Sequence, residues 1–98
     1  MQNTAEDLYF DTPLELQLKP GILNIGRAVD NDITLPMADI SLYHARIVTY
    51  FHQAVLMDLS SESGTFLNGE RVIKHSLKHG DVIQLGDQTL SVRLPSIL

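Results

Sequence analysis

The chain has 98 residues, of which 44% are hydrophobic and 19% are charged, and its formal net charge at pH 7 is −5. This length and composition predict one folded domain with its own core and exclude a disordered chain. The chain contains no cysteine, which excludes disulfides and thiolate metal sites. The acidic balance argues against nucleic acid or anionic lipid as a partner, so any anion must be bound locally.

The two ends of the chain predict its context. Residues 1–7 resemble no signal peptide, and no stretch approaches the roughly 20 apolar residues that span a bilayer. We therefore expect a cytoplasmic protein with no membrane partner. Residues 1–13 are expected to form an N-terminal segment with a possible first strand, and residues 14–94 the folded domain. The sequence stops on apolar residues with no polar tail, and residues 95–98 are therefore expected to be the start of a linker in a larger multidomain protein.

Short apolar or alternating runs, separated by turn residues about every 8–12 positions, predict an all-β sandwich. The alternating run 14–18 is expected to form a hairpin with a returning strand over 22–25, because Pro20-Gly21 suits a type II turn. Further strands are expected over 33–35, 45–50, 54–59, 65–67, 71–73, 81–85 and 88–94.

Two short turns predict further hairpins in the second half of the chain. Asn68-Gly69 is typical of a type I′ turn, in which both residues take positive φ, and Gly86-Asp87 follows the next apolar run. The apolar strand residues expected to build the core include Ile25, Ile47, Leu59, Phe66, Val82 and Leu85.

One segment also fits a helix. Apolar positions recur at helical spacing between Ile40 and Phe51, and Ser41 suits an N-cap, so a helix over 41–51 is an alternative. The β-branched residues at 47–49 favour a strand.

The sequence contains none of the common catalytic motifs, such as a nucleophile elbow, a phosphate-binding glycine loop or a zinc-protease helix. His75 and His79 have the spacing of a helical metal pair, but this segment is expected to be a loop between strands. Asp58, Ser60 and Glu62 alternate as in a calcium loop, yet the distal carboxylate ligand is missing. We therefore expect no enzyme, no metal and no cofactor.

Polar residues at predicted strand ends form the remaining candidate site. Arg27 offers a planar guanidinium suited to a phosphate dianion, and Ser41 offers a hydroxyl and a backbone N–H. Together they predict a phosphate clamp. Alternatively, Arg27 forms an ordinary surface ion pair with Asp30 or Asp32, and Ser41 is a turn or cap residue.

A series of short motifs runs along the chain in a specific order. They are Gly26-Arg27, Asp30-Asn31-Asp32-Ile33, Ser41-x-x-His44-Ala45, Asp58-Leu59, Gly64-Thr65-Phe66-Leu67-Asn68-Gly69, Gly80-Asp81-x-Ile83 and Leu85-Gly86. In this order and spacing the chain resembles the forkhead-associated (FHA) domain family over about residues 14–94. The resemblance implies a β-sandwich of about eleven strands in two sheets, with binding loops at one end. It also implies recognition of phosphothreonine-containing partner proteins in kinase signalling.

The resemblance assigns roles to individual positions. Arg27 and Ser41 match the family's phosphate ligands. The residues implied to shape the loops are Gly26, His44, Gly64, Asn68 and Gly69. Among these, His44 is implied to hold the binding loops by hydrogen bonds as a neutral, buried imidazole, and Asn68 to brace a neighbouring loop.

Three positions that are candidates for peptide contact depart from the family pattern. Leu42 stands where relatives often carry Asn or Arg, and Glu62-Ser63 stands where they often carry Thr-Asn. The first of that pair usually helps to hold the phosphate. The leading interpretation is a phosphothreonine-peptide-binding module that recruits a partner or its own parent chain. The alternative is a docking or oligomerisation domain of the same fold that binds unmodified protein.

Overall fold

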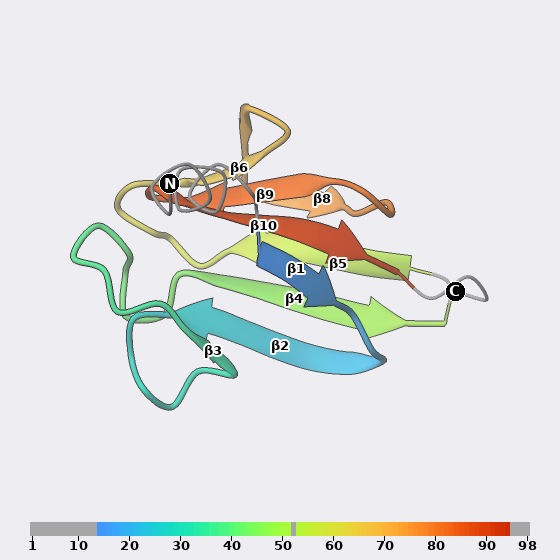
Figure 1. Ribbon diagram of the computed structural model, residues 1–98, viewed down its shortest axis with the longest axis horizontal. Coiled ribbons are helices and arrows are strands. Elements are labelled where there is room, and N and C mark those ends of the chain that lie inside the picture. Colours follow the sequence, from blue (N-terminus) through green and yellow to red (C-terminus); the bar gives the residue numbers. More distant parts are fainter. Residues whose placement is uncertain (1–13, 52, 95–98) are drawn as a thin grey trace, which may run out of the picture.

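The computed structural model describes residues 14–51 and 53–94, which form ten strands and no helix. The strands lie in two five-stranded sheets, with the orders β1-β10-β9-β6-β7 and β3-β2-β4-β5-β8. Their bounds are β1 Leu14–Gln17, β2 Gly21–Gly26, β3 Ile33–Thr34, β4 Ala45–Tyr50, β5 Gln53–Asp58, β6 Thr65–Leu67, β7 Glu70–Val72, β8 Lys74–Ser76, β9 Val82–Leu85 and β10 Gln88–Arg93. The predicted all-β sandwich is confirmed, and Figure 1 shows its strands stacked as two layers.

The helix considered over 41–51 is wrong, because residues 45–50 form strand β4. Side chains along β4 alternate between buried and half-buried positions, and the strand pairs with β2 on one side and β5 on the other. The β-branched residues at 47–49 correctly indicated a strand here, since such side chains pack well on a pleated surface. No helix in the described ranges is long and apolar enough to cross a membrane.

The hairpin expected between residues 14–18 and 22–25 is also wrong. Strand β1 pairs in parallel with β10 in one sheet, whereas β2 pairs with β3 and β4 in the other. Gly21 has the expected positive φ of 128°, but the turn carries the chain from one sheet to the other. Leu18 follows β1 and is buried, and its N–H donates to the carbonyl of Arg93, which keeps the chain on the first sheet until the turn.

Strand β8 was expected to be a loop. Its residues Lys74–Ser76 are all exposed, so they carry no apolar alternation that a sequence pattern could detect. The strand exists because its backbone pairs with β5 at the edge of the second sheet, with Met57 opposite Lys74 and Val55 opposite Ser76.

The two predicted tight hairpins are confirmed. Asn68 and Gly69 have φ values of 51° and 90° and join β6 to β7, as a type I′ turn requires. Gly86 has φ 58° in the turn between β9 and β10. These turns fix the register of the sheet that contains β6, β9 and β10.

The core lies between the two sheets. The expected core residues Ile25, Ile47 and Leu85 are fully buried in it. Leu59, Phe66 and Val82 are only half-buried. On β6, Thr65 and Leu67 point inward. Because side chains alternate along a strand, Phe66 between them is turned away from the core.

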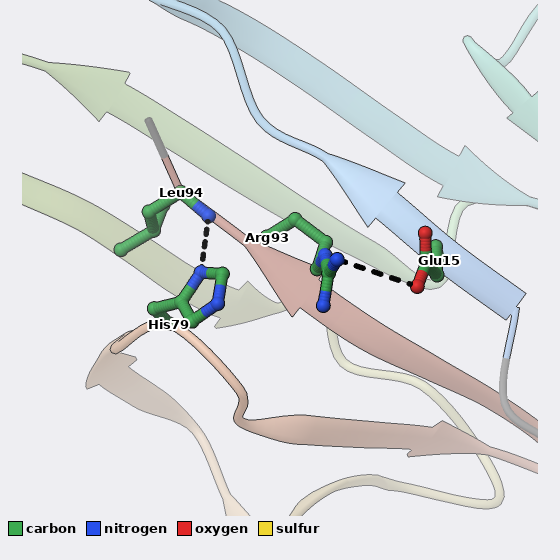
Figure 2. A network of polar contacts seen from close by, with 4 residues as sticks. All are labelled: Glu15, His79, Arg93 and Leu94. Carbon is green, nitrogen blue, oxygen red and sulfur yellow. Dashed lines mark hydrogen bonds and ion pairs between the residues drawn. The ribbon is translucent and has the colours of Figure 1, made fainter. Parts of the chain in front are cut away.

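Contacts at the end of β10 hold the last described residues in place. Figure 2 shows the N–H of Leu94 donating to Nδ1 of His79, which lies in the loop before β9, over 3.0 Å. It also shows Arg93 paired with Glu15 of β1 at 3.7 Å, an exposed ion pair that contributes little to stability. The expected first strand within residues 1–13 and the linker over 95–98 lie outside the described residues.

Candidate functional site

Three loops meet at one end of the sandwich. In the second sheet Ile25 pairs with Ala45, and Ala45 pairs with Asp58, so the end of β2, the start of β4 and the end of β5 are aligned. The loops 27–32, 35–44 and 59–64 therefore emerge side by side, at the left of Figure 1. Loops at one end of a β-sandwich are common binding surfaces.

Backbone hydrogen bonds join the first two of these loops. The N–H groups of Arg27 and Ala28 donate to the carbonyls of Ser41 and Leu42 over 2.9 and 3.1 Å. The buried side chain of Asn31 adds a link, because its Nδ2 donates to the carbonyls of both Ala28 and Leu42 over 2.8 Å. The two loops thus form one bonded unit.

Gly26 is required by the close approach of these loops. A Cβ atom at this position would stand 2.9 Å from the carbonyl carbon of Leu42 and 2.9 Å from Nδ2 of Asn31. Both distances are shorter than real side chains make, so any larger residue would force the loops apart. The role that the resemblance implied for Gly26 thus has a steric basis.

His44 connects the joined loops to the third. Its side chain is completely buried, and its Nδ1 accepts a hydrogen bond from the N–H of Ser41 over 3.1 Å. Because Nδ1 accepts, the ring proton sits on Nε2, which donates to the carbonyl of Gly64 over 2.9 Å. The imidazole is therefore the neutral Nε2–H tautomer and bridges the loops.

The hydrogen bond to His44 also corrects one expectation about Ser41. Its backbone N–H was expected to be available to a phosphate, but that group is already bonded to the imidazole. Of the two donors of Ser41, only the hydroxyl hydrogen remains without a partner among the described residues.

The third loop is organised by Asp58, a role that the sequence did not reveal. The Asp58 carboxylate accepts hydrogen bonds from the hydroxyl and backbone N–H of Ser61 and from the Thr65 hydroxyl. The Ser61 hydroxyl in turn accepts from the N–H of Gly64 over 3.0 Å. Burial raises the pKa of Asp58, but the hydrogen bonds from Ser61 and Thr65 outweigh it and hold the pKa below its usual value.

A hollow of about 270 Å³ lies on the outer side of the loops. It is lined by Arg27, Ala38, Asp39, Ile40, Ser41, Leu42 and Glu62. The Arg27 Nε donates to the carbonyl of Ile40 over 2.9 Å, which orients the guanidinium and leaves its terminal nitrogens without a partner among the described residues. The Ser41 hydroxyl oxygen accepts from the N–H of Glu62 over 3.1 Å, so its own hydrogen remains available.

The alternative assignment of Arg27 to a surface ion pair is wrong. Asp32 accepts a hydrogen bond from the N–H of Asn24 over 2.7 Å, and Asp30 accepts from the Tyr43 hydroxyl, whose pKa this bond raises. Within the described ranges Arg27 forms no ion pair.

The hollow includes two of the three expected peptide-contact residues. Leu42 and Glu62 line it, and the Leu42 side chain is 49% exposed. Ser63 does not line it, and its hydroxyl instead donates to the carbonyl of Asp39 over 2.8 Å. Asp39 itself lines the hollow and was missed, because no sequence pattern places the interior of a long loop.

The remaining residues of the site prediction lie away from the hollow. The Asn68 side chain donates to Asp81 over 3.0 Å and accepts from the N–H of Val82 over 2.9 Å, so it braces the loop that leads into β9. Gly69 completes the turn beside it. Gly64 has φ 94° and lies against the guanidinium of Arg71, where a Cβ would be 2.8 Å from its Nε.

The two sets of residues with metal-ligand spacing in the sequence do not come together in the structure. His75 lies on β8 and His79 in the following loop, whereas Asp58 faces Ser61 and Glu62 lines the hollow. Over residues 14–51 and 53–94, no three His, Asp or Glu side chains converge as metal ligands would.

Fold and site together define a β-sandwich with a hollow on the outer side of its end loops, a class of domain that binds its ligand through loops. Residues 23–86 match the FHA domain, and the chain belongs to that family. Over 71 residues, 72% of this chain, it is 42% identical to the ABC transporter ATP-binding/permease protein Rv1747 of Mycobacterium tuberculosis. The chain spans 8% of the length of that relative.

Solved structures agree with this assignment. A structure from a study of phosphothreonine-dependent FHA domain interactions superposes with a TM-score of 0.70 and 38% identity, covering 74% of this chain and 75% of that one. Mycobacterium tuberculosis EmbR, solved in complex with a low-affinity phosphopeptide, gives a TM-score of 0.72 and 36% identity over 76% of this chain and 20% of EmbR.

Proposed function

We propose that this domain is an interaction module that binds phosphothreonine-containing segments of a partner protein or of its own parent chain. The observation that carries the proposal is the hollow in which the Arg27 guanidinium and the Ser41 hydroxyl face the same space. Both groups keep hydrogen-bond donors that no described residue uses.

The chemistry of these two groups fits a phosphate. The guanidinium is held at its Nε by the Ile40 carbonyl, so its terminal nitrogens can donate to two phosphate oxygens at once. The Ser41 hydroxyl can donate to a third oxygen. Each charge-assisted hydrogen bond contributes roughly 1.5–3 kcal/mol to binding.

The family supports the same function. The structure of EmbR holds a phosphopeptide, and another similar structure comes from work on phosphothreonine-dependent interactions. We further propose that the domain is non-catalytic, needs no cofactor and acts in the cytoplasm, and that it is one part of a larger multidomain protein, as its match to 20% of EmbR suggests.

The departures from the family pattern predict a weaker phosphate site. At position 62 this chain carries a carboxylate in place of the usual threonine hydroxyl, although the Glu62 side chain makes no ion pair with Arg27 in the described part of the chain. Loss of one charge-assisted donor alone weakens binding by about tenfold to a hundredfold. Leu42 offers an apolar surface to the peptide where relatives often offer a polar one.

Titration calorimetry with peptides selected from a phosphothreonine array tests the proposal. The wild-type domain should bind a phosphorylated peptide and not its unmodified counterpart, and Arg27→Ala should abolish binding. Arg93→Ala is the matched control, because it removes an exposed arginine that stands at the C-terminal end of β10 and does not line the hollow. Equal affinity for phosphorylated and unmodified peptides would instead favour a phospho-independent docking module.

A further inference from the structure

The hollow that Arg27 lines is also lined by two acidic residues. Asp39 and Glu62 line it together with Arg27, so its ionisable groups are one cation and two anions. A site built only to attract a phosphate dianion would not place two negative side chains beside its single guanidinium. This arrangement needs an explanation in terms of the ligand.

Neither carboxylate has a protein partner in the part of the chain that the structure describes. No ion pair includes Asp39 or Glu62, and no hydrogen bond ends on their carboxylate oxygens. The charge of a carboxylate that is paired within the protein is largely neutralised by its partner, whereas the charges of Asp39 and Glu62 can act on a ligand.

The backbone holds both residues at the edge of the hollow. The Asp39 carbonyl accepts the Ser63 hydroxyl, and the Glu62 N–H donates to the Ser41 hydroxyl. The Asp39 carboxylate also lies against Gly86 in the turn between β9 and β10, where a Cβ would stand 2.9 Å from Asp39 Oδ1. Gly86 thus leaves the space that this carboxylate occupies.

Charge repulsion makes the neighbours of the phosphothreonine important. A phosphate carries a charge of about −1.5 to −2 at neutral pH, so it is repelled by carboxylates within several ångströms. A lysine or arginine in the same peptide would lie beside those carboxylates and reverse the sign of the interaction. An acidic neighbour would add to the repulsion.

We propose that Asp39 and Glu62 are specificity residues that select phosphothreonine segments carrying a lysine or arginine within about three residues of the phosphothreonine. An extended peptide advances about 3.3 Å per residue, so a long basic side chain at these positions reaches the edge of the hollow. This inference rests on the proposed phosphothreonine function and names the class of segment that the site takes.

The test uses phosphothreonine peptides with alanine at all flanking positions except one, which is lysine, alanine or glutamate in turn. In calorimetry at low salt, the wild-type domain should prefer lysine over glutamate by about tenfold at one or more positions. Asp39→Asn and Glu62→Gln should each reduce that ratio by about twofold to threefold, and the double variant should nearly remove it. Glu70→Gln, an exposed charge on β7, is the control and should leave the ratio unchanged.

The outcomes separate the two levels of the proposal. Phosphopeptide binding with no lysine preference, or with a preference that the double variant retains, would overturn the specificity inference and leave the phosphate site intact. Equal binding of phosphorylated and unmodified peptides would overturn both. The wild-type ratio should also shrink as salt rises, because a charge-based preference is screened, and a ratio that does not change with salt would overturn the inference.

Discussion

The two sides of the loop cluster use their polar groups differently. On the inner side, His44 and the carboxylate of Asp58 are bonded to Ser41, Ser61, Gly64 and Thr65, and each ring nitrogen and carboxylate oxygen has a partner. On the outer side, the terminal nitrogens of Arg27 have no partner among the described residues.

We call the bonded inner residues His44, Asp58, Ser61 and Thr65 the frame, and the outer residues Arg27, Ser41 and Glu62 the binding surface. Groups that are fully bonded within the protein fix the loops before a ligand arrives, which lowers the entropy lost on binding. Groups left unbonded at the surface supply the new interactions. Substitutions on the inner side should therefore act first on stability, and those on the outer side mainly on affinity.

The largest effect is expected for His44→Ala. Removing the imidazole leaves the N–H of Ser41 and the carbonyl of Gly64 without a partner and opens a cavity, which should lower the free energy of unfolding by about 3–5 kcal/mol. Urea unfolding measures this loss. His75→Ala removes an exposed ring on β8 and should change stability by no more than about 0.5 kcal/mol. Similar values for both variants would contradict the assignment of His44 to the frame.

Asp58→Asn should lower stability by about 1–2 kcal/mol at neutral pH, because an amide cannot accept all the hydrogen bonds of the carboxylate. The folded pKa of Asp58 lies below its unfolded value of 3.8, so its contribution is present above that value and is lost as pH falls through the folded pKa.

Urea unfolding across the acidic range measures this dependence on pH. The stability difference between the wild type and Asp58→Asn should shrink as the carboxyl protonates. A difference that stays constant or grows toward low pH would contradict the role given to Asp58.

On the outer side, Ser41→Ala should weaken phosphopeptide binding by about tenfold, since one donor to the phosphate is lost. Its effect on unfolding should be smaller than that of His44→Ala, because the N–H of Glu62 loses only an exposed acceptor. Calorimetry and urea unfolding of the same variant measure both. Ser76→Ala on β8 is the control, and equal affinities for the two variants would exclude the Ser41 hydroxyl as a phosphate ligand.

The smallest effect is expected for Glu62→Thr. With an alanine-flanked phosphothreonine peptide, this change should strengthen binding by about twofold to fivefold, because it removes a like charge, while a hydroxyl introduced into a loop that is not shaped around it recovers only part of the contribution of a preorganised donor. The gain should decrease as salt increases. Glu70→Thr should leave the affinity unchanged, and a loss of affinity in Glu62→Thr would mean that the carboxylate does not face the phosphate.

Local signals in the sequence were sufficient for most of the fold. The turn at Asn68 and Gly69 and the strand over residues 45–50 follow from the conformational preferences of their own residues. The separation of β1 and β2 into different sheets was not predictable, because a Pro-Gly turn does not determine which strands pair after it. Strand β8 was missed since only its pairing with β5 makes it a strand.

The candidate site was predictable only in part. Arg27, Ser41 and His44 stand in a recognisable series of motifs. The hydrogen bonds of Asp58 with Ser61 and Thr65 could not be predicted, because they depend on the path of the loop between these residues. That Asp39 and Arg27 line the same hollow depends on the path of loop 35–44. Neither arrangement leaves a periodic signal in the sequence.

The most direct test of the phosphate site is an NMR titration of the ¹⁵N-labelled domain with a phosphothreonine peptide and its unmodified counterpart. The backbone amide signals of Arg27, Leu42 and Glu62 should shift with the phosphorylated peptide alone, because these residues line the hollow. The outer faces of both sheets should be unaffected. Equal shifts with both peptides, or shifts concentrated on the outward side of β2, β4 and β5, would contradict a phosphate site at Arg27 and Ser41.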